Sequence, residues 1–459
     1  NKISPRAACG TVTLGDSGDS FVIPAGATIT NNGTQTGFGR EGSVDWQTSS
    51  IKTTTFTATS GEGYFVDTSS GAVTCNLPAG TAGAIVAFAD YTRTFNTHNL
   101  TISPNGSNKI GGVNADSVLN VNGQAITLVF VDATEGWINV QNAEDTETGN
   151  PNIVATGGTV TTCGNCKIHT FTGPGTFTVS NISTTPANNE VSYLVVAGGG
   201  GAEGGGGGAG GFREVKSPTT PYTASPLDGY PNAPNRVTIT KTSFPITVGG
   251  GGAAGSDPSP GGDGGDSVFS TITSKGGGGG AHQGASGSSQ SGGSGGGSGQ
   301  DSSASGGAGN TPPVSPPQGN NGGAGGPGPY GGSGAGGGAT AVGSNAGTKI
   351  SPIPGSPGSN GGAGAGTLIA PASGEGGPGP SRYYSGGGAG GSNVDANPTP
   401  GAIVQGFGGI GGGGNGGRDA SSNGGSGTAN TGGGAGGGEW QGNGGAGGSG
   451  IVVIRYKFQ

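Results

Sequence analysis

Residues 440–449 read Trp-Gln-Gly-Asn-Gly-Gly-Ala-Gly-Gly-Ser, and the pattern in this stretch decides how the second half of the chain folds. Trp440, Asn443, Ala446 and Ser449 are each three residues apart, with Gly-Gly inside the last two intervals. Three residues per turn is the period of the polyproline II helix, which has no internal hydrogen bonds. Where two of its three faces are glycine, neighbouring helices approach closely enough for N–H···O=C bonds between them. The repeat therefore predicts an ordered stack of threefold helices.

The three-residue spacing recurs between Gly198 and Gly450, where most of the 115 glycines of the 459-residue chain lie. Glycine and proline at this level would predict disorder if they had no period, because ordering each backbone residue costs about 1–2 kcal/mol. The period argues against disorder. Further sets with this spacing are Ala324, Pro327, Tyr330 and Ser333; Pro260, Asp263 and Asp266; Asn423, Ser426 and Ala429; and the pairs Asn360–Ala363, Phe407–Ile410 and Asn415–Arg418.

Proline-rich or bulky segments interrupt the repeat, and we interpret them as turns that join antiparallel glycine helices. These segments are residues 311–317, 350–354, 381–384 and 397–400. Strand-like pieces frame the repeat. The closing strand, 451–458, is expected to pair with residues 193–197 and so to seal the module end to end.

The first half of the chain predicts short β-strands. Apolar residues alternate at Val73, Cys75 and Leu77, and at Leu119 and Val121, with Asn-Gly and Glu-Gly turn signals between runs. No amphipathic helical stretch competes with this pattern. We therefore expect an all-β chain with essentially no α-helix. Its expected parts are a short β-repeat segment (1–48), an all-β module (49–148), a β-strand segment (149–197) and the glycine-rich module (198–459).

Composition limits the classes of function. The net charge of −8, with no Lys/Arg cluster longer than a dipeptide, argues against nucleic acid as a partner. The sequence contains no run of about 18 apolar residues, so we expect no segment that spans a membrane. The chain contains no methionine, so we interpret it as a fragment or a processed product. The four cysteines, Cys9, Cys75, Cys163 and Cys166, are too few for a disulfide scaffold of this size.

Cys163-x-x-Cys166-x-x-His169 is the one group with metal-like spacing. It supplies three ligands, whereas structural zinc takes four. Packing along a strand explains the same residues, and a Cys163–Cys166 disulfide is about as plausible as a metal site. We predict no metal and no cofactor, with this triplet as a weak candidate.

Nothing in the sequence predicts an enzyme. The nearest carboxylate pairs are Asp132 with Glu135 and Asp263 with Asp266, and a position in turns explains both better than acid–base chemistry. The glycine-rich runs lack the Gly-Lys-Ser/Thr ending of a phosphate-binding loop that opens a helix. A depolymerase activity is the enzymatic alternative.

Aromatic and arginine side chains of the glycine-rich half are the candidate contact residues, since this sequence holds too few aliphatic residues to bury them all. Such side chains at loop tips are typical binding anchors. The candidates are Tyr222, Tyr230, Tyr330, Arg382, Tyr383, Tyr384 and Trp440. Local packing is the competing explanation, for Trp440 at the edge of the stack and for Tyr383 and Tyr384 in a short strand.

Several segments resemble the glycine-rich domain of phage tail fibres and related adhesins. They are residues 193–200, 246–252, 267–273 and 448–456. Upstream, residues 163–179 resemble the strand segment that often precedes this domain, and residues 44–53 and the stretch through 137–140 resemble fibre modules common in marine phages. The resemblance implies a stack of polyglycine II helices with receptor-binding loops at its far end. It also implies a homotrimeric fibre, in which residues 1–48 belong to the shaft.

From the resemblance we expect a non-catalytic tail-fibre adhesin at the distal end of the fibre, extracellular in the virion. Its expected partners are a glycan or an outer-membrane protein of the host surface, other tail proteins and further copies of itself. One alternative is a capsid decoration or purely structural virion fibre. A second is an ice-binding or extracellular structural glycine-rich protein, although ice binding favours a flat face of uniform small residues and the third positions here are mixed.

Overall fold

The computed structural model describes residue 22 and residues 44–141, 151–284, 289–300, 303–328, 330–347, 355–394, 404–418 and 421–459. Most of the expected β-repeat segment 1–48 therefore lies outside the described residues. The chain divides into two compact units, Asn1–Gly106 with Leu119–Asp145, and Ser107–Val118 with Thr146–Gln459. No described helix is long and apolar enough to cross a membrane.

Strands and sheets dominate the described residues, as the sequence predicts. The helical pieces among them are two short 3-10 helices, η2 (Pro186–Asn189) and η3 (Ala233–Asn235). Each has a proline in its first turn, where the missing N–H removes no helical hydrogen bond.

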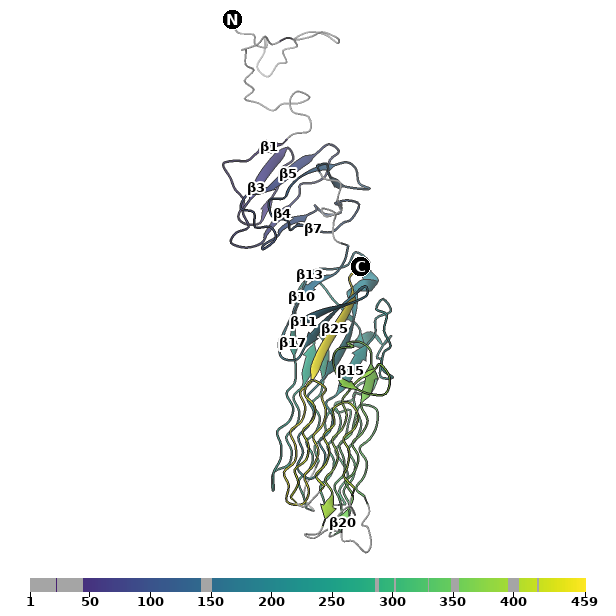
Figure 1. Cartoon of the computed structure of the whole chain (residues 1–459). Coiled ribbons are helices and arrows are strands. Elements are labelled where there is room, and N and C mark those ends of the chain that lie inside the picture. The colour runs from purple at the N-terminus through teal and green to yellow at the C-terminus, as the bar shows by residue number, and fades with distance from the viewer. Residues whose placement is uncertain are drawn as a thin grey trace. The chain divides into compact units, whose positions relative to one another are not determined.

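Two sheets are built from residues 45–139 (Figure 1). The first has the order β1 (Asp45–Trp46), β3 (Glu62–Val66), β5 (Ile85–Asp90), β8 (Ala125–Phe130) and β9 (Trp137–Asn139). The second has the order β2 (Phe56–Thr57), β4 (Val73–Asn76), β6 (Leu100–Ser103) and β7 (Ser117–Leu119).

The predicted period of two is confirmed in the second of these sheets. Val73 and Cys75 on β4 and Leu100 on β6 are all buried. The expected continuation from Leu119 to Val121 is wrong, because β7 ends at Leu119 and a turn follows. Val121 is left 55% exposed.

Two larger sheets lie in the second unit. One has the order β11 (Thr159–Cys163), β12 (Cys166–Phe171), β25 (Ile451–Lys457), β14 (Glu190–Val196) and β15 (Phe212–Val215), with β16 (Val237–Thr238) also paired to β14. The other has the order β10 (Val154–Thr156), β13 (Gly175–Asn181), β17 (Ser243–Thr247), β18 (Ser267–Phe269) and β19 (Ile272–Ser274).

Smaller sheets complete the second unit. A three-stranded sheet has the order β21 (Ala365–Thr367), β23 (Arg382–Tyr384) and β22 (Glu375–Gly376). A two-stranded sheet joins β20 (Gly355–Ser356) to β24 (Asn393–Val394).

The expected pairing of the closing strand is confirmed. β25 lies antiparallel to β14, with Val196 opposite Ile451 and Ser192 opposite Arg455. Both strands are buried along almost their whole length, because hydrophobic clusters cover the two faces of their sheet. The strands before and after the glycine-rich segments therefore meet at the centre of one core.

Between the larger sheets and the end that carries β20, extended segments lie side by side (Figure 1). Backbone hydrogen bonds join them, and the partner segment returns every third residue. Gly206 and Ala209 donate to Gly334 and Gly337, Gly207 and Gly210 to Ala435 and Gly432, and Gly208 and Gly211 to Gly278 and Lys275. One segment thus bonds to three different neighbours, one parallel to it and two antiparallel. This array has the three-residue period that the sequence predicts.

The close approach of the segments explains the glycine content. A Cβ at Gly207 would lie 2.1 Å from the carbonyl oxygen of Gly200, and a Cβ at Gly434 would lie 2.0 Å from that of Gly207. Unstrained contacts of this kind are about 3.3–3.6 Å long. At inner positions with room for a methyl group, alanine is buried, as at Ala202, Ala209, Ala335, Ala389 and Ala435.

Candidate receptor-contact surfaces

One candidate surface lies at the end of the array that carries β20 and β24 (Figure 1). Tyr330 belongs to this end, because its carbonyl oxygen accepts a hydrogen bond of 2.8 Å from the Ser356 hydroxyl. The φ angle of Tyr330 is 73°, a left-handed conformation that is uncommon for residues other than glycine. The tyrosine side chain is half-buried. Tyr330 therefore lies at this end of the array, partly accessible and held by a hydrogen bond to β20.

Trp440 reaches the same end of the array and is 47% exposed. Its neighbour Glu439 accepts a 3.3 Å hydrogen bond from the Gln283 side chain at its carbonyl oxygen. The backbone N–H of Gln283 donates to the Glu203 carboxylate over 2.8 Å. Gly391, two residues before β24, donates to the carbonyl of Gly204. Hydrogen bonds thus link segments from four parts of the sequence next to Trp440.

Buried acidic side chains hold these turns together. Glu203 and Glu439 are each 1% exposed, and the Glu439 carboxylate accepts the Ser421 amide over 2.8 Å. Burial raises the pKa of Glu203 to about 7, against the lowering effect of the hydrogen bond from Gln283. Trp440 therefore follows a residue, Glu439, that is hydrogen-bonded to two other segments of the chain.

The other candidate residues lie at the strand end of the unit, and the structure removes Tyr384 from the set. The Tyr384 side chain is fully buried in a cluster with Phe212, Ile451 and Val453. It therefore cannot contact a receptor, and local packing in β23 is the correct explanation. The aliphatic side chains that bury it come from strands distant in sequence, so their proximity was not apparent from the glycine-rich sequence alone.

Tyr222 is also mainly structural. Its hydroxyl donates to the Val215 carbonyl over 3.4 Å, and the Arg455 guanidinium lies 5.1 Å from the centre of its ring. Burial, followed by the nearby Glu214 carboxylate, raises the pKa of Tyr222 well above its ordinary value. The ring packs against the hydrophobic cluster beside Leu227.

Arg382, Tyr383 and Tyr230 are partly accessible at this strand end. The Arg382 Nε donates to the Pro371 carbonyl over 2.8 Å, and the Tyr383 ring lies against Gly377, where a Cβ would come within 2.4 Å of it. Tyr230 is 36% exposed. The structure thus separates the candidates into two groups at opposite ends of the array, and does not bring them together in one site.

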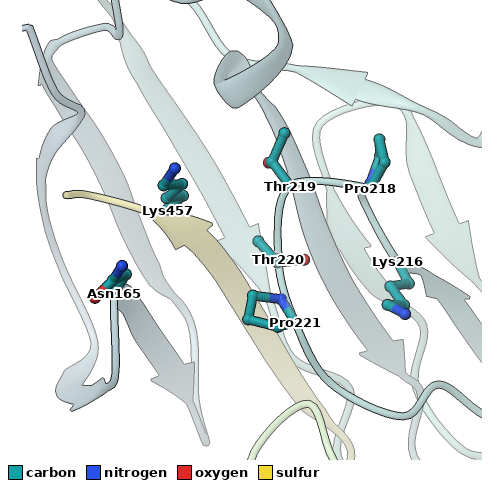
Figure 2. A pocket seen from close by; sticks show the side chains of 7 residues that line it. All are labelled: Asn165, Lys216, Pro218, Thr219, Thr220, Pro221 and Lys457. Carbon is teal, nitrogen blue, oxygen red and sulfur yellow. The ribbon is translucent and has the colours of Figure 1, made fainter.

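A hollow of about 330 Å³ opens at the strand end (Figure 2). It is lined by Asn165, Lys216, Pro218, Thr219, Thr220, Pro221 and Lys457. Two lysines and no carboxylate line it, so its chemistry suits an anionic group. The sequence offered no signal for this hollow, because β25 and the hairpin turn at Asn165 are almost 300 residues apart.

The Cys163, Cys166 and His169 triplet does not converge. Cys163 and Cys166 face each other across the β11–β12 turn as free cysteines, the first exposed and the second buried. The His169 ring is buried instead, with Nδ1 2.7 Å from the Gly157 carbonyl oxygen and Nε2 3.1 Å from the Tyr456 hydroxyl. Burial lowers the pKa of His169. Among the described residues no group of three His, Cys, Asp or Glu side chains could hold a metal ion, and Cys9 lies outside them.

The two carboxylate pairs have different roles. Asp132 is a turn residue as expected, since its Oδ1 accepts the amides of Thr134 and Glu135 over 2.8 and 2.9 Å. For Asp263 and Asp266 the expected turn is wrong. Both lie within an extended segment of the array and accept amides of the neighbouring segment, those of Gly279 and Gly276 respectively.

Asparagine side chains also accept backbone amides of neighbouring segments along the exposed edges of the array. Asn360 accepts the Phe407 amide, Asn415 accepts the Gly408 amide, and both bonds are 2.9 Å long. Inside the array, backbone amides donate to the carbonyl groups of a neighbouring glycine segment. At the edges, side chains at the third positions of the repeat accept these amides instead.

Family models match two parts of the chain. Residues 172–457 match a glycine-rich domain, and residues 18–143 match a module described as Bacteriophage T4 gp9/10-like protein, N-terminal. No curated protein matches the chain. The N-terminal match supports a structural protein of the phage tail or baseplate, and hence a virion component that interacts with other tail proteins. The first match covers more than half of the sequence, and the chain belongs to the glycine-rich domain family.

Proposed function

We propose that this chain is the distal, receptor-binding part of a phage tail fibre, extracellular in the virion and without catalytic activity. Its host ligand is a cell-surface glycan or an outer-membrane protein. The observation that carries the proposal is the exposed Trp440 on a platform tied together by buried Glu203, Gln283 and Glu439. Tryptophan is enriched among residues that dominate binding energy.

The array supports this function by rigidity. We infer that its segments are polyglycine II helices, since their hydrogen-bond partners return every third residue and each segment bonds to several neighbours. A platform that is already ordered loses little conformational entropy when a ligand binds. Weak contacts at each tip then add by avidity in a homotrimer, the assembly that we propose for the fibre.

A pair of variants of the full chain tests the proposal. Trp440→Ala removes the exposed indole, and we expect binding to host cells to fall about tenfold or more. Val342→Ala is the matched control, because Val342 is 62% exposed in a turn near the strand end. Equal binding by the two variants and the native chain would refute the role of this surface.

A structural role in the virion without host recognition is the competing function, and the phage-type N-terminal match favours it equally. Antibody labelling of virions separates the two. Label at the fibre tip supports the adhesin, whereas label at the head or along the shaft supports the structural protein. Release of reducing sugars from host polysaccharide by the chain would contradict the absence of catalysis.

A further inference from the structure

The glycine-rich array contains the Asn-Gly dipeptide at five places, beginning at Asn321, Asn360, Asn415, Asn423 and Asn443. This dipeptide is chemically reactive, because glycine has no Cβ to keep its backbone nitrogen away from the carbonyl carbon of the preceding side-chain amide. All five asparagines are exposed. Access to water therefore does not distinguish them, and the hydrogen bonds of the two reacting groups decide which step reacts.

At the Asn360–Gly361 step, a neighbouring segment holds both reacting groups. The Asn360 side-chain oxygen accepts the Phe407 N–H over 2.9 Å, and the Gly361 N–H donates to the Phe407 carbonyl over 2.9 Å. Attack by the Gly361 nitrogen requires the side chain to turn back toward its own main chain and the N–H to leave its acceptor. Both hydrogen bonds must break first, so this step is locked.

Three further steps are locked in the same way. At each, the asparagine side-chain oxygen accepts a backbone N–H of a neighbouring segment, and the following glycine donates to a carbonyl of that segment. The N–H groups that the side chains accept are those of Gly309 for Asn321, Gly408 for Asn415 and Asn443 for Asn423, over 2.8 to 2.9 Å. The carbonyl groups that the following glycines reach are, in the same order, those of Gly307, Gly406 and Asn443, over 2.9 to 3.0 Å.

The Asn443–Gly444 step has neither lock. The Asn443 side-chain amide has no hydrogen-bond partner among the described residues, and within the same part of the chain the Gly444 N–H has none either. The main chain of Asn443 is held on both sides, because its N–H donates to the Asn423 side chain and its carbonyl accepts the Gly424 N–H. The residue therefore has a defined position, while its side chain is free to turn toward the Gly444 nitrogen.

We propose that Asn443 is a site of spontaneous deamidation in the folded protein. The Gly444 nitrogen gives up its proton and forms a bond to the side-chain carbonyl carbon of Asn443. The C–N bond of the side-chain amide breaks, and ammonia leaves with the proton, so that the two residues share a cyclic imide. Water then opens this ring at one of its two carbonyl carbons. The product is aspartate, or isoaspartate in which the main chain runs through the former side chain.

The conversion changes the chain close to Trp440. Both products carry a carboxylate three residues after Trp440, where the native chain has a neutral amide. Isoaspartate also adds one carbon to the main chain before Gly444. The Gly445 N–H, which donates to the Gly436 carbonyl over 2.9 Å, then loses its place in the three-residue repeat. The turn that carries Trp440 is thus altered as the protein ages, whether or not it binds a host.

Tandem mass spectrometry of the full chain, aged at mildly alkaline pH, tests the proposal. The mass gained when an amide becomes an acid is followed at each of the five asparagines, and a sample unfolded in guanidinium chloride gives the reference rate for each step. We expect the ratio of folded to unfolded rate at Asn443 to exceed that at each locked step by at least about tenfold, because two hydrogen bonds must break there. Asn423 is the matched control, since it is also exposed and lies beside Asn443.

A rate ratio at Asn443 equal to or below that at Asn423 would overturn the proposal. An Asn443→Gln variant should lose the fast conversion and keep the slow conversion at Asn360, because the longer glutamine side chain closes a larger ring. Fast conversion that persists in the same peptide of this variant would place the reaction at another residue and also overturn the proposal. None of these results would alter the prediction for Trp440.

Discussion

Gly207→Ala is the substitution that probes the array most directly. Gly207 lies in an inner segment, and its Cβ would come within 2.1 Å of the Gly200 carbonyl oxygen and 2.8 Å of the Gly201 carbonyl oxygen. An unstrained contact needs about 3.3–3.6 Å. The two segments would therefore have to separate by about 1.2 Å, and no flexible side chain stands between them to absorb the change.

The separation breaks hydrogen bonds as well as packing. Gly200 donates to Gly208 over 2.8 Å, and a shift of this size would lengthen that bond beyond a useful distance. An unsatisfied buried amide costs about 1–3 kcal/mol, and overpacking a dense interior costs about 1–3 kcal/mol. We expect Gly207→Ala to lower the free energy of unfolding of the glycine-rich unit by about 2–6 kcal/mol.

Gly250→Ala is the matched control, because a Cβ at Gly250 meets nothing within 4 Å. It should leave stability unchanged or raise it by about 0.4–1 kcal/mol, since alanine restricts the unfolded chain. Differential scanning calorimetry of the full chain measures both variants, with the transition of the first unit as an internal reference. Equal transition temperatures for Gly207→Ala and Gly250→Ala would show that the close approach of the segments does not determine stability, and would refute the reasoning.

Glu203→Gln should flatten the pH dependence of stability. The pKa of Glu203 is about 7 in the folded protein against an ordinary 4.5, so its favourable contribution is complete below pH 4.5 and is lost as the pH rises through 7. Allowing for solvent screening, the native chain should lose about 1–3 kcal/mol of unfolding free energy between pH 5 and pH 8, measured by urea titration. If Glu203→Gln lost the same amount over this range, the ionisation of Glu203 would not be the cause. Tyr384→Phe should be neutral or stabilising by up to about 1 kcal/mol, because the Tyr384 hydroxyl is buried without a hydrogen-bond partner among the described residues. A thermal melt that shows clear destabilisation would rule that out.

The aromatic candidates show where sequence reasoning about the site stops. Scarcity of aliphatic residues predicted only that not all of them could be buried, and it left open which of them pack locally. The structure leaves Trp440 47% exposed and buries Tyr384 fully. The aliphatic partners of Tyr384 come from β15 and β25, which flank the glycine-rich segments in sequence. Burial is a property of the assembled core, and local composition does not report it.

The carboxylates of the glycine-rich half illustrate the same limit. Glu203 follows a glycine run as an isolated charge, and nothing in its neighbourhood predicts that the amide of Gln283 will meet it. Asp263 and Asp266 were expected in turns because aspartate favours turns, yet both accept amides along an extended segment. Which amides need a partner depends on which segments lie beside each other.

The sequence by itself determined the all-β character of the chain, the three-residue period of its glycine-rich half and the pairing of Tyr193 with the closing strand. These features follow from local periodicity, because glycine on two of three faces and alternation on strands are written in consecutive residues. Only the tertiary structure decided which end of the array carries Trp440 and which tyrosines are buried. Those features depend on contacts between residues far apart in sequence, which the closing of the core brings together.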